Sequence, residues 1–201
     1  IWMPWDRAVA VWDALASAGP AFDLHAAGML ALDVARVEAG LLLIDVDFQS
    51  SRKALIESQK YTPSELGLGR LVDLGKSSFV GRRALVDEHR RGHGRQIVGL
   101  ELDWPEVEAL YEDVGLPPAV AAQTSRVAVP VYRGSTQIGR ATSTTWSTTL
   151  KKMIALATID RPYFAIGSRV EMEVTVDATR HRAPATVVAT PFFNPARKTA
   201  P

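Results

Sequence analysis

Apolar and polar residues alternate with a period of two through much of the second half of this chain, and this pattern restricts its fold most. Six segments carry the alternation that is typical of half-buried strands: Gln96 to Leu102, Val127 to Tyr132, Gln137 to Thr142, Met153 to Ile159, Arg169 to Val176 and Ala183 to Thr190. Arg133-Gly134-Ser135 is typical of a hairpin turn between two of them. Six short strands joined by turns predict a small antiparallel barrel or sandwich.

Helical spacing characterises the first half. Apolar residues recur at this spacing from Trp5 to Ala16, and Gly19-Pro20 is expected to end that helix. A second helix is predicted from about His25 to Ala39, with Gly40 suited to the left-handed position after its end. A third, basic helix is predicted from Phe79 to Arg91. A solvated face is the simplest explanation for its charges.

Two short apolar stretches of the first half also read as strands. A strand at Ile1-Trp2-Met3 needs a neighbour, so we expect its partners upstream and the chain to be a fragment; the alternative is an engineered start. Leu41 to Phe48 is interrupted by Asp45 and Asp47, which either end the strand or act as general acid and base. Thr62-Pro63-Ser64-Glu65 has the pattern of a capping box, which predicts a structural Glu65.

The composition excludes several classes of protein. Lys and Arg number 23 against 22 Asp and Glu in 201 residues, so no overall field attracts nucleic acid or an anionic membrane surface. No apolar run is long enough to span a bilayer. The chain has no cysteine, which removes disulfides and thiolate metal sites and is compatible with the cytoplasm, where we expect this protein. The four histidines lack ligand spacing, so we expect no metal site.

The common catalytic motifs of hydrolases, nucleotide-binding proteins and dehydrogenases are also absent. Arg36 is the most unusual polar residue, because it lies near the end of a predicted helix among Val34, Val37 and Ala39. Burying an arginine there requires an anionic partner. Spacing leaves two explanations open: an ion pair with Asp33 one turn earlier, or contact with a ligand. Glu38 lies two positions away and points elsewhere.

Five segments, in order along nearly the whole chain, resemble motifs of the aminomethyltransferase (glycine-cleavage T-protein) family. The segment Ala35-Arg36-Val37-Glu38-Ala39-Gly40 resembles the family's Arg-x-Glu-Ala-Gly motif. The others are Thr62-Pro63-Ser64-Glu65, Phe79-Val80-Gly81-Arg82-Arg83-Ala84-Leu85, Gly139-Arg140-Ala141-Thr142-Ser143 with Trp146-Ser147-Thr148-Thr149-Leu150, and Phe192-Phe193-Asn194-Pro195.

The resemblance implies an α+β fold: the C-terminal part of a ferredoxin-like folate-binding region over residues 1–93, then an antiparallel β-barrel domain over residues 94–201. It implies tetrahydrofolate as cofactor, with Arg36 and Glu38 as candidate folate-binding residues. The family's catalytic aspartate lies upstream of its Arg-x-Glu-Ala-Gly motif, so no catalytic residue is assigned. The expected partners are the N-terminal half of the same protein and a small methyl or aminomethyl donor.

Two departures favour a paralogue over the T-protein itself. About ten extra residues lie near Ser50 to Lys60, and Thr148 stands where the family has proline. Such paralogues move a one-carbon unit from an N-, S- or O-methylated molecule to tetrahydrofolate, which makes a demethylase activity possible here. Three alternatives stay open: a non-catalytic folate-binding protein, a folate domain of a larger amine dehydrogenase, and a protein-interaction module.

Overall fold

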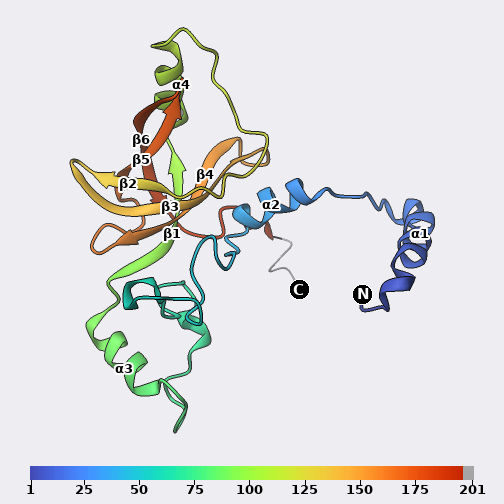
Figure 1. Ribbon diagram of the computed structural model, residues 1–201, viewed down its shortest axis with the longest axis horizontal. Coiled ribbons are helices and arrows are strands. Elements are labelled where there is room, and N and C mark those ends of the chain that lie inside the picture. Colours follow the sequence, from blue (N-terminus) through green and yellow to red (C-terminus); the bar gives the residue numbers. More distant parts are fainter. Residues whose placement is uncertain (197–201) are drawn as a thin grey trace. The chain divides into compact units, whose positions relative to one another are not determined.

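The computed structural model describes residues 1–196 (Figure 1). The chain forms two compact units, Ile1–Leu32 and a second that begins at Asp33. The first unit contains η1 (Trp5–Arg7), α1 (Ala8–Ala18), η2 (Gly19–Phe22) and the start of α2 (Met29–Glu38). The predicted helix that ends at Gly19-Pro20 is therefore confirmed. No helix within residues 1–196 combines the length and apolar character needed to cross a membrane.

The strand predicted at Ile1-Trp2-Met3 is wrong. These residues have no regular structure, and the side chains of Ile1 and Trp2 are exposed. The physical reason is the absence of a partner, because no strand of residues 1–196 offers an edge to this segment.

Six strands close into a barrel in the second unit: β1 (Arg95–Leu102), β2 (Val129–Arg133), β3 (Thr136–Ser147), β4 (Lys152–Asp160), β5 (Arg169–Val176) and β6 (Thr179–Val188). Their order around the barrel is β1-β4-β3-β2-β5-β6, and each neighbouring pair is antiparallel. Figure 1 shows the strands wrapped around a common axis. The predicted barrel and the α+β class are confirmed; the division into domains at residues 93 and 94 stays a prediction.

Strand β4 is buried on both faces. Ala155, Ala157 and Ile159 belong to the cluster that fills the barrel. Ile154 and Leu156 point the other way and pack against Val37 of α2, with Leu42 and Phe192 at the margin. Burying a side chain such as Val37 contributes about 1.5–3 kcal/mol. This second cluster holds the end of α2 on the outer wall of the barrel.

The segment between α2 and the barrel is mostly turns. Its regular elements are η3 (Glu57–Gln59), η4 (Gly69–Leu71) and α3 (Arg82–Arg91), and a further helix, α4 (Trp104–Glu112), follows β1. The capping box is confirmed, because the Thr62 N–H donates to Glu65 at 3.1 Å and the Glu65 N–H donates to Thr62 at 3.2 Å. It starts only a short run of turns, since no α-helix follows it before Arg82.

Candidate functional site: an arginine network on the barrel wall

The end of α2 turns the chain sharply. Gly40 has φ +67° and donates its N–H to the Val37 carbonyl at 2.8 Å, and the Leu41 N–H donates to the Arg36 carbonyl at 2.8 Å. This pair of bonds is a Schellman cap, as Gly40 predicted. The following loop returns to the side chain of Arg36, because Asp47 in that loop bonds with it.

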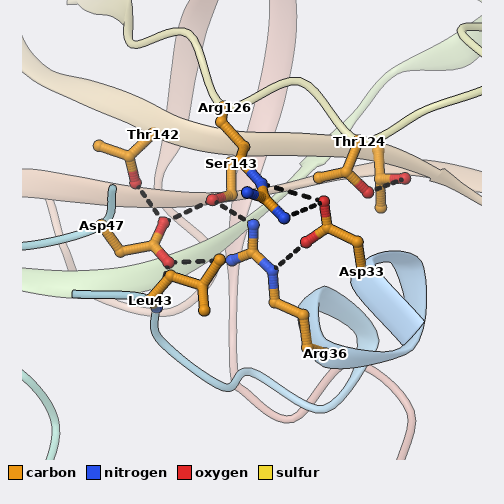
Figure 2. Close-up of polar contacts among 9 residues, drawn as sticks. Asp33, Arg36, Leu43, Asp47, Thr124, Arg126, Thr142 and Ser143 are labelled. Atoms are coloured by element: carbon orange, nitrogen blue, oxygen red, sulfur yellow. Dashed lines mark hydrogen bonds and ion pairs between the residues drawn. The ribbon is translucent and has the colours of Figure 1, made fainter. Parts of the chain in front are cut away.

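The guanidinium of Arg36 lies at the centre of a buried network (Figure 2). Its Nε donates to Asp33 Oδ1 at 2.8 Å, Nη1 to Asp47 Oδ2 at 2.9 Å and Nη2 to Ser143 Oγ at 2.9 Å. The ion pair with Asp33 that spacing offered is therefore present. An arginine has five N–H donors, so two of them have no partner within residues 1–196.

Asp47 is fully buried and accepts four hydrogen bonds. Besides Arg36, its donors are the Leu43 N–H at 2.8 Å, the Thr142 hydroxyl at 2.7 Å and the Ser143 hydroxyl at 2.6 Å. Leu41 to Phe48 is thus not the predicted strand but a loop around the carboxylate of Asp47. The β-type pairing of this segment is limited to an isolated bridge between Ile44 and Phe48. Asp47 therefore has a structural role here, because its carboxylate joins the loop, α2 and β3 through four hydrogen bonds.

Strand β3 supplies both hydroxyls through a bulge. Ala141 pairs with Ala157 and Ser143 with Leu156, so Thr142 is the extra residue in the ladder. Consecutive side chains of a regular strand point to opposite faces, whereas a bulge re-aims one of them. As a result, Thr142 and Ser143 both donate to the same oxygen of Asp47.

Asp33 connects Arg36 to a second arginine. Its Oδ2 accepts a hydrogen bond from Arg126 Nε at 3.1 Å and lies 2.9 Å from Arg126 Nη2 in an ion pair, while Oδ1 accepts from Arg36. Burial acts to raise the pKa of Asp33, but the hydrogen bonds and charges of Arg36 and Arg126 outweigh it and hold the pKa below the usual aspartate value. Two arginines therefore balance two buried aspartates in the network.

Glu38 lies apart from these contacts. Its Oε1 accepts from the Ser147 hydroxyl at 2.5 Å, and its backbone carbonyl accepts from the Phe193 N–H at 3.0 Å. Arg36 and Glu38 thus bond with different residues of β3, as their two-residue spacing predicted. Asp45, the other candidate acid, is partly exposed at the surface and pairs with Lys53 at 2.5 Å.

Two family profiles match this chain over most of its length. The glycine cleavage T-protein C-terminal barrel domain matches residues 95–194, and the GCVT N-terminal domain matches residues 1–76. The chain belongs to the glycine-cleavage T-protein family. Its barrel and its arginine network are therefore features of a T-protein-family chain.

Curated relatives and a solved structure agree with this assignment. The chain is 34% identical to an aminomethyltransferase of Bacillus cytotoxicus over 94% of the chain and 43% of the relative. It is 35% identical to a trimethylamine-oxide aldolase of Ruegeria pomeroyi, over 97% of the chain and 21% of that protein. The crystal structure of glycine cleavage system aminomethyltransferase T from Bartonella henselae has the same fold, with TM-score 0.69 at 20% identity over 95% of this chain and 45% of that one. This T-protein-family chain thus spans less than half the length of these relatives.

Sequence reasoning found Arg36 and Asp33 but missed the rest of the network. Asp47, Ser143 and Arg126 come from a loop, a strand and a connection that lie 11, 107 and 90 positions from Arg36. One signal pointed to them: Ser143, Thr145 and Ser147 place hydroxyls at every second position of β3, and all three are buried. A row of buried hydroxyls on one strand face indicates polar partners packed against that face.

Proposed function

We propose that this protein takes part in moving a one-carbon unit from a small N-, S- or O-methylated donor to tetrahydrofolate. Its membership of the T-protein family carries the proposal, because two relatives named above are an aminomethyltransferase and a trimethylamine-oxide aldolase. We further propose that activity requires the part of the relatives that this chain does not cover, where we expect the catalytic aspartate and the second half of the folate channel.

Arg36 is the proposed folate anchor. The charge of its guanidinium is already balanced by Asp33 and Asp47, so a third anion gains little from it. The two remaining N–H groups instead suit a neutral hydrogen-bonding edge, such as that of the pterin ring. The buried ion pairs fix the plane of the guanidinium, which pre-orients those donors and lowers the entropy cost of binding.

Glu38 is proposed as the second folate-binding residue of this chain. The Ser147 hydroxyl orients its carboxylate through Oε1, in the same turn of α2 as Arg36. Tetrahydrofolate would supply the nitrogen that accepts the one-carbon unit. The two side chains would hold the pterin in place, since positioning of the reacting atoms is a large part of catalysis.

Isothermal titration of the full-length protein with tetrahydrofolate tests this proposal. Arg36→Lys keeps the charge between the two aspartates but removes the planar fork, and we expect affinity to fall about tenfold to a hundredfold, the worth of one charge-assisted hydrogen bond. Arg182→Ala is the control, because Arg182 contacts the hairpin residues Tyr132 and Gly134 and not the network. Equal affinity of Arg36→Lys and the wild type would remove Arg36 from the site.

A second candidate function is a folate domain within a longer amine-metabolising enzyme. The relative from Ruegeria pomeroyi supports it. Nearly all of this chain, 97%, aligns with that relative, but the alignment covers only 21% of the relative's length. A flavin absorption spectrum of the purified full-length protein would favour this candidate. Tetrahydrofolate binding without turnover of any methylated amine, thioether or ether would instead favour a non-catalytic folate-binding protein, and unchanged melting in the presence of folate would favour an interaction module.

A further inference from the structure

Arg126 occupies a fixed position although its side chain is 54% exposed. It follows Ser125, which forms a reciprocal pair of backbone hydrogen bonds with Thr144 of β3. The Ser125 N–H donates to the Thr144 carbonyl at 2.8 Å, and the Thr144 N–H donates to the Ser125 carbonyl at 2.9 Å. The hydroxyls of Thr124 and Thr145 bond at 3.1 Å beside it. These bonds fix the backbone next to Arg126, and its guanidinium contacts Asp33 (Figure 2).

Arg126 is the hydrogen-bond donor to the Oδ2 atom of Asp33. Oδ2 accepts one hydrogen bond, from Arg126 Nε, and forms an ion pair with Arg126 Nη2, whereas the single bond to Oδ1 comes from Arg36. The carboxylate is buried, so an Oδ2 without donors carries a large desolvation cost. The guanidinium of Arg36 already touches this carboxylate and still has two N–H groups to give.

Loss of Arg126 would therefore turn Asp33 into a competitor for those donors. The carboxylate would rotate both oxygens toward Arg36, in the two-point geometry that guanidinium and carboxylate groups prefer. The network would also carry one net negative charge, because two aspartates would then face a single arginine. Both effects lower the capacity of Arg36 to donate to a ligand.

We propose that Arg126 is a positioning residue for the folate site, which keeps the remaining N–H groups of Arg36 available by satisfying Asp33. This inference rests on the proposed function and extends it to a residue outside the family-like motif around Arg36. It predicts that the effect of Arg126 passes through Asp33, so a change at Asp33 can cancel a change at Arg126.

The test compares Arg126→Gln, Arg126→Lys and the double variant Asp33→Asn with Arg126→Gln in the full-length protein. Arg126→Gln is expected to bind tetrahydrofolate about tenfold more weakly, the worth of one hydrogen bond that Arg36 would then give to Asp33 and not to the ligand. Arg126→Lys retains a cationic donor and should bind like the wild type. In the double variant, a neutral amide replaces the Asp33 carboxylate and no longer competes for Arg36, so affinity should return to near the wild-type value.

The double variant separates positioning from simple stabilisation. If Arg126 only stabilises the fold, the double variant loses further bonds and its affinity falls to or below that of Arg126→Gln, which would overturn the inference. Equal affinity of Arg126→Gln and the wild type would overturn it too. If Arg126→Gln does not fold, the double variant decides: affinity near the wild-type value supports the inference, and a loss of about tenfold or more counts against it. A wild type that does not bind tetrahydrofolate refutes the proposed function itself.

Discussion

Replacing Asp47 by alanine is expected to destabilise the protein strongly. The substitution removes a fully buried carboxylate and leaves Arg36 Nη1, the Leu43 N–H and the Ser143 hydroxyl without the acceptor that they use now. Thr142 loses less, because its hydroxyl also lies 3.2 Å from a backbone carbonyl. Arg36 keeps its other two bonds, so the buried cation is weakened but not left alone.

The magnitude follows from these contacts. Removing one partner of a buried ion pair costs about 3–5 kcal/mol. A buried donor that loses its acceptor costs about 1–3 kcal/mol. These terms overlap, because they describe the same carboxylate, and Arg36 keeps a second aspartate. We therefore expect a loss of about 4 kcal/mol, which lowers the Tm of a domain of this size by about 8–16 °C.

Scanning calorimetry and urea unfolding of the wild type, Asp47→Ala and Asp45→Asn measure this difference. Asp45 is the matched control, since it lies two residues away, pairs with Lys53 at the surface and has φ +66°, which asparagine tolerates. An exposed pair of this kind contributes about 0–1 kcal/mol. A loss of Tm in Asp47→Ala no larger than in Asp45→Asn would refute a stabilising role for the buried Asp47 carboxylate.

Acid sensitivity and the turn after α2 give two more predictions. Because the folded pKa of Asp33 is below the unfolded value of about 3.9, its stabilisation is complete above that value and is lost as the pH falls through the folded pKa. Urea unfolding at neutral and acidic pH should therefore show a smaller acid-induced loss in Asp33→Asn, and an equal loss would contradict this. Gly40 and Gly115 have φ +67° and +69°, but a Cβ at Gly40 would lie 2.9 Å from Thr190 and one at Gly115 would touch nothing within 4 Å. Alanine at either position costs about 1–2 kcal/mol of backbone strain. Gly40→Ala should therefore lower the free energy of unfolding, measured with urea, by more than Gly115→Ala does. Equal losses would exclude a clash with Thr190.

The barrel was predictable because its signal is local. Arg169–Val176 has the bounds predicted from alternation, and its buried residues Val170, Met172 and Val176 all lie on the face that the alternation predicted. The second helix starts at Met29 and not at His25 because Gly28, a poor helix former, precedes its first turn. Such features depend on a few neighbouring residues, which a sequence window contains.

The arginine network was only half predictable because most of its bonds are not local. Asp33 lies three positions from Arg36, so helical spacing pointed to that pair. Asp47 looked like the polar end of a strand, since its neighbours Leu43 and Phe48 are apolar. Its real environment comes from a turn and from hydroxyls about 95 residues away, and no short pattern encodes that distance.

The bulge at Thr142 makes the two halves of the β2–β3 hairpin unequal for protein engineering. Residues can be added or removed around Gly134, because the tip of the hairpin contacts Arg182 and not the arginine network. Deleting one residue between Gly139 and Ser143 would restore a regular ladder but would send one of the two hydroxyls away from Asp47. A loop graft intended to leave the arginine network intact therefore belongs at the tip, and the bulge sets the limit of the exchangeable segment.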